Sequence, residues 1–262
     1  MLHTRRADRP RAADLIRTVF TDVVSLHSTA ELILALARVG GYPCVLIAGE
    51  DQGPPLGPGA LRVARRGVRL AAGLSLPLIC VIDTPAAEGS AQAELDGLAS
   101  EIAGCLADLI AVPVPTIALL LGQGAGGAAL ALLPADRVLA AQHAWLAPLA
   151  PEGASAIIYR DVGRAPELAA RQRIRAVDLA EDRIVDCVIA ETSADTRRLC
   201  RDLRHALHQA IEILAGQDHD MRMAERPAAT AISFCRPMGH RYLWPDYRSP
   251  GLAILLLKIT YA

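Results

Sequence analysis

Residues 116–132 read TIALLLGQGAGGAALAL, and the expected architecture follows from this stretch. The apolar run at 116–121 is typical of a strand buried on both faces. The glycine-rich residues after it open a helix, which makes a strand–turn–helix junction. Tiny side chains at such a junction let a ligand approach the backbone, and the amides at the start of a helix favour negative charge.

Similar apolar runs recur along the chain and predict further strands at 44–48, 78–83, 137–141 and 184–190. Apolar residues spaced by three and four predict amphipathic helices between them. Strands that alternate with helices indicate an α/β fold. The predicted helical stripes are Val63, Gly67, Leu70 and Leu74, then Leu95, Leu98, Ile102, Leu106 and Leu109, and finally Leu199, Leu203, Leu207 and Leu214.

The composition limits the classes of function. The chain has 262 residues, 52% of them hydrophobic and 21% charged, which excludes a disordered chain and permits a sizeable core. The net charge of −1 provides no field for nucleic-acid binding. Lys258 is the only lysine among 27 basic residues, so a Schiff-base lysine or a phosphate-loop lysine is excluded before the last few residues.

The chain divides into three predicted segments. These are an N-terminal helical segment at 1–30, one domain at 31–226, and an atypical, poorly ordered tail at 227–262 that holds five of the nine aromatic residues. We expect no secretory signal and no membrane span, because the start lacks an apolar run and the run at 252–257 is too short. The six scattered cysteines form no C-x-x-C pair, which favours reduced, structural thiols in a cytoplasmic protein.

The glycine-rich loop supports three interpretations. Gly122, Gly124 and Gly127 match G-x-G-x-x-G, but the acidic residue of a dinucleotide site should end the next strand, and Asp136 precedes that strand. The second interpretation is a close crossing of helix and strand with no ligand. The third is an oxyanion hole, in which paired backbone N–H groups stabilise an anion without a charged side chain.

Two turns and one basic stripe offer further candidates. The turn Asp83-Thr84-Pro85 ends a strand, where parallel sheets gather ligands, although it equally fits a simple turn cap. Gly153-Ala154-Ser155-Ala156 begins like the G-x-S-x-G elbow of serine hydrolases, but Ile157 replaces the closing glycine and the spacing suggests no Ser–His–Asp set, so such a hydrolase is not expected. The histidines show no metal-ligand spacing, and we expect no bound metal.

One basic stripe is a further candidate. Arginines spaced by three and four form either a phosphate-steering stripe or a solvated face, and they are Arg62, Arg65, Arg66 and Arg69.

Taken together, these segments resemble the carboxyltransferase component of biotin-dependent acyl-CoA carboxylases, and most closely the α-type half of acetyl-CoA carboxylase carboxyltransferase. The resemblance runs from Arg9 to Ala190, and seven short motifs carry it in the family's order. They are Pro58-Gly59-Ala60-Leu61-Arg62-Val63-Ala64-Arg65-Arg66, Leu76-Pro77-Leu78-Ile79 with Asp83-Thr84-Pro85, Ser100-Glu101-Ile102-Ala103, Val112-Pro113-Val114-Pro115-Thr116, the loop and helix at 122–132, Asp136-Arg137-Val138, and Pro151-Glu152-Gly153-Ala154-Ser155-Ala156-Ile157.

The resemblance implies a crotonase-like fold, a spiral of ββα units. It implies transfer of a carboxyl group from carboxybiotin, on a biotin carboxyl carrier protein, to an acyl-CoA such as acetyl-CoA, which gives malonyl-CoA. A β-type carboxyltransferase subunit would supply most of the CoA-binding surface. By the same resemblance, backbone oxyanion donors lie among Gly126, Gly127, Ala128 and Ala129, the biotin ring lies near Pro85, Ala86 and Gly153, and Arg62, Arg65 and Arg66 are candidates for the CoA phosphates.

The chain departs from the family pattern at a few positions. Ala86 stands where the family has glycine, and Ala125 and Ala128 reduce the glycine content of the loop. Two alternatives to an active carboxyltransferase subunit therefore stay open. One is a non-catalytic assembly homologue, and the other is a crotonase-type enoyl-CoA hydratase or isomerase that uses Glu88 or Glu152.

Overall fold

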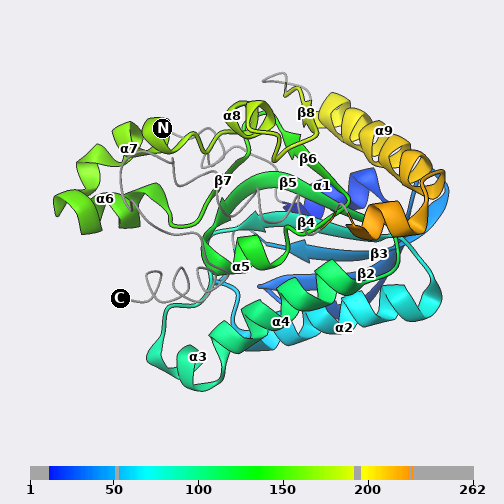
Figure 1. Cartoon of the computed structure of the whole chain (residues 1–262), viewed down its shortest axis with the longest axis horizontal. Helices are drawn as coiled ribbons and strands as arrows, with labels where there is room; N and C mark the ends of the chain where they lie inside the picture. Colours follow the sequence, from blue (N-terminus) through cyan, green and yellow to red (C-terminus); the bar gives the residue numbers. More distant parts are fainter. Residues whose placement is uncertain (1–11, 51–52, 192–195, 225, 227–262) are drawn as a thin grey trace.

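A mixed sheet of eight strands carries the part of the chain that the computed structural model describes, which is residues 12–50, 53–191, 196–224 and 226 (Figure 1). The strands are β1 (Thr21–Ser28), β2 (Leu32–Val39), β3 (Tyr42–Gly49), β4 (Leu78–Thr84), β5 (Thr116–Ala125), β6 (Arg137–Ala141), β7 (Trp145–Ala147) and β8 (Cys187–Ile189). The helices are α1 (Ala12–Val19), α2 (Pro58–Leu74), α3 (Ala91–Leu95), α4 (Leu98–Ala111), α5 (Gly126–Ala131), α6 (Pro151–Tyr159), the 3₁₀ helix η2 (Val162–Arg164), α7 (Ala165–Gln172), α8 (Ala176–Glu181) and α9 (Thr196–Ala215).

The sheet has an antiparallel part and a parallel part. The order is β1-β2-β3-β4-β5-β6-β8, and β7 pairs with the end of β5. The pairs β1–β2 and β2–β3 are antiparallel, and every pair from β3 onward is parallel. All seven residues of β4 are buried, which explains why its sequence is apolar for most of its length. The carboxyl ends of β4 and β5 therefore meet at one edge, where loops gather.

Helices cover both faces of this sheet. Figure 1 shows α2 and α4 side by side on one face and α9 on the other. Helix α2 begins with Pro58 directly after Gly57, and Pro at the first helical position loses no backbone bond. It buries mostly small side chains, including Ala60, Ala64 and Ala71, which lets it lie close to the strands. Figure 1 also shows α6 and α7 projecting beyond the sheet.

The predicted strands are confirmed, with β6 at the expected bounds and β8 shorter than expected. The buried face of α2 differs from the predicted stripe by a rotation about the helix axis. Gly67 is buried, but Leu74 is 48% exposed, and the buried face runs through Leu61 and Val68 instead. In the next stripe, Leu95 is 82% exposed because it belongs to the separate short helix α3.

The prediction of an N-terminal helical segment at 1–30 is wrong for residues 21–28. Helix α1 ends at Val19, and the chain then forms β1, which pairs with β2 at the border of the sheet. Six consecutive residues of β1 are exposed, so the strand has no apolar pattern to announce it. The segment also belongs to the same core, because Leu15, Ile16 and Val19 are buried within it.

A buried ion cluster closes the amino end of the parallel sheet. The Asp136 carboxylate accepts bonds from the backbone N–H of Thr116 at 2.8 Å, from Arg222 at 3.0 Å and from Arg226 at 2.9 Å. Arg226 is fully buried and also donates to the carbonyl oxygens of Leu109, Val112 and Val114. The cluster therefore fixes residues 222 and 226 against the starts of β5 and β6.

The tail predicted at 227–262 lies outside the described residues. No helix of the described part combines the length and the apolar character that crossing a bilayer requires. The same part contains no group of three or more His, Cys, Asp or Glu side chains that could hold a metal ion.

Candidate functional site

The carboxyl ends of β4 and β5 bring the predicted turn and the glycine-rich loop together. The two strands are in parallel register up to Ile82 and Leu120, and register resumes where Thr84 pairs with Gly124. One residue of β4 therefore lies opposite three residues of β5. This is a bulge, which bends a strand and re-aims the residues after it.

Asp83 is the single residue of β4 at this bulge. Its side chain is almost fully buried, and its Oδ1 accepts a hydrogen bond from the backbone N–H of Gln123 at 2.9 Å. A Cβ atom on Gly122 would lie 2.0 Å from the same oxygen. Position 122 thus requires glycine for space, because any side chain would collide with the carboxylate.

The predicted oxyanion donors begin at the bend after β5. Gly126 has φ +71°, a left-handed conformation that L side chains rarely adopt, and it is the first residue of α5. Gly126, Gly127, Ala128 and Ala129 form the first turn and a little more of this helix, and all four are buried. Among the described residues, the N–H groups of Gly127 and Ala128 have no hydrogen-bond acceptor, as the first turn of a helix leads one to expect.

The alanine replacements in the loop fit its backbone. Ala125 has φ −116°, an extended conformation open to any residue, and Ala128 lies inside α5. Neither these two nor Ala86 belongs to the residues with positive φ in the described chain. Gly126, which needs that conformation, is retained. The three departures from the family pattern therefore put no strain on the predicted donors.

The predicted biotin-side positions lie on two segments beside the loop. The turn after β4 approaches Gly126, because a Cβ atom there would lie 3.8 Å from the backbone nitrogen of Ala87 and 4.0 Å from the carbonyl oxygen of Pro148. Pro85 and Ala86 are half-buried in this turn, and the Ala86 carbonyl accepts a bond from Leu56 N at 3.0 Å. Gly153 is half-buried in the first turn of α6, which begins three residues after Pro148.

The structure separates the predicted phosphate-binding arginines. Arg65 donates to Asp108 at 2.8 Å and to Glu101 at 3.0 Å, and Arg62 pairs with Glu101 at 3.3 Å. Hydrogen bonds to these two carboxylates raise the pKa of the Arg65 guanidinium above its already high ordinary value. Both arginines therefore bind α2 to α4.

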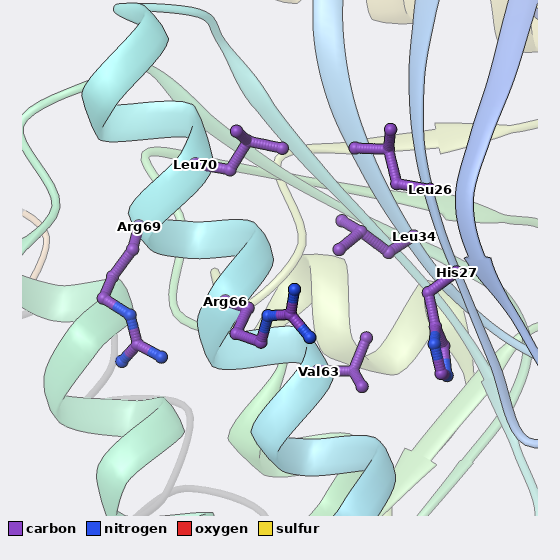
Figure 2. Close-up of a pocket in the computed structure, with 7 residues that line it drawn as sticks. All are labelled: Leu26, His27, Leu34, Val63, Arg66, Arg69 and Leu70. Carbon is purple, nitrogen blue, oxygen red and sulfur yellow. The ribbon is translucent and has the colours of Figure 1, made fainter.

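Arg66 lies on another side of α2. Figure 2 shows its guanidinium in a groove between α2 and the strands, where it points toward His27, while Arg69 points away from the strands. The groove has a volume of about 600 Å³ and is otherwise mostly apolar, with Leu26, Leu34, Val63 and Leu70 in its walls. It does not include the residues of the glycine-rich loop.

The carboxylate candidates for a hydratase are placed differently. Ser90 donates to Glu88 at 2.7 Å, and the Ser90 hydroxyl in turn accepts the N–H of Ala93 as the cap of α3. Glu88 is therefore part of a helix start. Glu152 lies in the first turn of α6, where a carboxylate complements the helix dipole.

Comparison with known families places this geometry in context. Residues 1–230 match the family model described as acetyl co-enzyme A carboxylase carboxyltransferase-like. A probable biotin-dependent acyl-coenzyme A carboxylase beta3 subunit of Mycobacterium tuberculosis is 53% identical over 72% of this chain and 40% of that protein. An acetyl-coenzyme A carboxylase carboxyl transferase subunit alpha of Heliobacterium modesticaldum is 34% identical over 80% of this chain and 69% of that protein. The chain thus spans less than half the length of the mycobacterial relative.

Solved structures agree on the fold. The transcarboxylase 12S core superposes with a TM-score of 0.69, with 24% identity over 78% of this chain and 41% of that chain. A Pseudomonas malonate decarboxylase hetero-dimer gives a TM-score of 0.67, with 20% identity over 85% of this chain and 97% of that chain. These neighbours have the carboxyltransferase version of the crotonase-like fold, which confirms the predicted fold class.

Proposed function

Because this chain belongs to the acetyl co-enzyme A carboxylase carboxyltransferase-like family, we propose that it is the α-type half of a carboxyltransferase that carboxylates acetyl-CoA to malonyl-CoA. A β-type subunit and a biotin carboxyl carrier protein would complete the assembly. The same proposal assigns the chain to fatty acid biosynthesis in the cytoplasm.

The first turn of α5 carries this proposal. The N–H groups of Gly127 and Ala128 have no acceptor in the described structure, and they follow a bend that Gly126 makes with φ +71°. Two main-chain donors on one turn suit an oxygen that gains negative charge during a reaction. Orphaned donors of this kind therefore fit the ureido oxygen of biotin, and Pro85, Ala86 and Gly153 would lie beside the ring.

Carboxybiotin and the protein chain would contribute different parts of the chemistry. Carboxybiotin, when bound, supplies the carboxyl group, and its ureido nitrogen is the expected base for the α-proton of the acyl-CoA. The protein needs no acidic or basic side chain for that step. Its own contribution is to hold the ureido oxygen by amides fixed before the reaction begins, to orient the ring, and to exclude water.

Reconstitution with the partner subunit and a biotinylated carrier tests the proposal. The assembly should convert labelled carboxybiotin and acetyl-CoA into malonyl-CoA, whereas this chain alone should have little activity. Gly127→Val should lower kcat by about 100-fold or more, because a branched side chain blocks access to the donors. Assays with longer acyl-CoAs would define the substrate range.

Gly73→Val is the matched control, because Gly73 is an exposed position of α2 with open space around its missing Cβ. Full activity of the Gly127→Val assembly would instead favour the non-catalytic homologue. Hydration of a short enoyl-CoA by this chain alone would favour the hydratase.

A further inference from the structure

The bulge between β4 and β5 depends on one carboxylate. Asp83 faces Leu121, Gly122 and Gln123, the three β5 residues that have no regular partner on β4. Its Oδ1 holds the N–H of Gln123 at 2.9 Å, and its carboxylate occupies the volume that a side chain at 122 would need. The acceptor at 83 and the missing Cβ at 122 are therefore a matched pair.

Both halves of the proposed site begin at this pair. Along β5, the chain runs from Gln123 to the bend at Gly126 within three residues. Along β4, it runs from Asp83 through Thr84, the last residue of the strand, into Pro85 and Ala86. The two segments lie close together, because a Cβ atom placed on Gly126 would be 3.8 Å from the backbone nitrogen of Ala87. A change in the bulge would therefore shift the amides of α5 relative to the turn after β4.

We propose that Asp83 is a positioning residue for carboxyl transfer, which sets the distance between the α5 amides and the turn after β4. This inference rests on the proposed function. The role requires an acceptor oxygen at the Oδ1 position and does not require proton transfer, because Asp83 acts through Gln123 and Gly122.

Three variants separate position from charge in the reconstituted assembly. Asp83→Asn keeps an oxygen acceptor of the same size without the charge, and kcat should stay close to that of the wild type. Asp83→Ala leaves the Gln123 N–H without this acceptor, and kcat should fall by about 100-fold, the scale of a misplacement near 1 Å. The KM for acyl-CoA should be unchanged, since the CoA surface is assigned to the partner.

Gly122→Ala should lower kcat similarly, because its Cβ would lie 2.0 Å from Oδ1. In the double variant Asp83→Ala with Gly122→Ala, the new methyl group enters the space that the carboxylate left. The two losses should therefore not add. Asp83→Glu carries the same test if the alanine variant does not fold, because it keeps the charge but moves the acceptor, and its kcat should fall.

Amide hydrogen exchange over residues 122–129 gives a readout apart from activity. Exchange should rise in Asp83→Ala and stay unchanged in Asp83→Asn. An unchanged kcat in Asp83→Ala, or an equal loss in Asp83→Asn and Asp83→Ala, would overturn the positioning role. If the wild-type assembly transfers no carboxyl group, the proposed function fails, and unaffected exchange in Asp83→Ala would then reject the positioning of the loop as well.

Discussion

At the scale of single residues, burial controls the chemistry of the thiols. Cys44, Cys80 and Cys105 are buried, and removal of the thiolate from water raises the pKa of each to about 12. Burial also raises the pKa of Cys200. Cys187 is the exposed thiol among the described residues. Reactivity follows the thiolate fraction and access, so these cysteines should differ sharply.

We expect iodoacetamide at pH 8 to label Cys187 in the native protein and to leave the four buried cysteines unmodified. Peptide mass spectrometry would assign each site, and labelling in urea would serve as the control in which all thiols react. Fast native labelling of Cys80, which lies inside β4, would contradict the structure.

At the residue scale, the sequence GQGAGG indicated a strand–turn–helix junction, and Gly126 makes that turn with φ +71°. The oxyanion-donor and biotin-side roles of individual residues stay predictions. The need for glycine at 122 could not be predicted, because it comes from Asp83, which is distant in sequence. Pairing of Arg65 with Glu101 and Asp108 was equally hidden, since the contact joins two helices.

At the scale of elements, the ion cluster at Asp136 should make the largest contribution to holding residues 222 and 226 against the starts of β5 and β6. The side chain of Arg226 is fully buried and that of Asp136 is 2% exposed. Loss of the Arg226 charge leaves the buried Asp136 carboxylate with Arg222 as its remaining ion-pair partner in the described structure, and it removes the donor that reaches the carbonyl oxygens of Leu109, Val112 and Val114. Arg226→Met should therefore lower the free energy of unfolding by about 3–5 kcal/mol. Urea denaturation would measure it.

The control is Arg197→Met, at an exposed position of α9 with no ion pair in the described structure. This substitution should change the free energy of unfolding by less than about 0.5 kcal/mol. Equal effects of the two substitutions would contradict the buried cluster.

The start of α8 predicts a pH dependence. Asp178 accepts bonds from the Arg175 side chain at 2.8 and 3.0 Å and from its backbone N–H at 3.3 Å. The hydrogen bond to the Arg175 side chain lowers the pKa of the Asp178 carboxyl below its ordinary value. Because the native pKa is below the unfolded value, the stabilisation is complete above about pH 4 and is lost as pH falls through the native pKa.

Asp178→Asn should lower the free energy of unfolding by about 1 kcal/mol at pH 7, which is typical for the loss of a helix cap. Chemical denaturation at several pH values would show the difference from wild type shrinking below about pH 4. A difference that stays constant through the acid range would exclude the ionised carboxylate as its source.

Element types were readable from the sequence when burial was two-sided. Strands β4, β5 and β6 are apolar for this reason, and their predicted positions are confirmed. Strand β1 was missed because its exposed residues follow no apolar rule. The buried face of α2 was predicted incorrectly because the helix contacts the sheet largely through alanine and glycine, whose hydropathy gives little signal.

At the scale of the whole molecule, strand–helix alternation predicted the fold class, but it could not predict which distant segments meet. Helices α1 and α9 are the clearest case. Helix α1 packs against α9, and Arg204 of α9 donates to the carbonyl oxygens of Thr18 and Val19. No local pattern reports a contact that spans 185 residues.

The contact between α1 and α9 limits where the chain can be truncated. A recombinant fragment starting at residue 31 would remove α1, which packs against α9, and with it the two carbonyl oxygens that Arg204 binds. It would also remove β1, so that β2 becomes an unpaired edge strand of the sheet. The free N–H and C=O groups of an exposed edge strand can pair with the backbone of another chain and cause aggregation. Expression boundaries for crystallisation or binding studies should therefore keep residues 12–30 with the remainder, however dispensable their polar sequence makes them look.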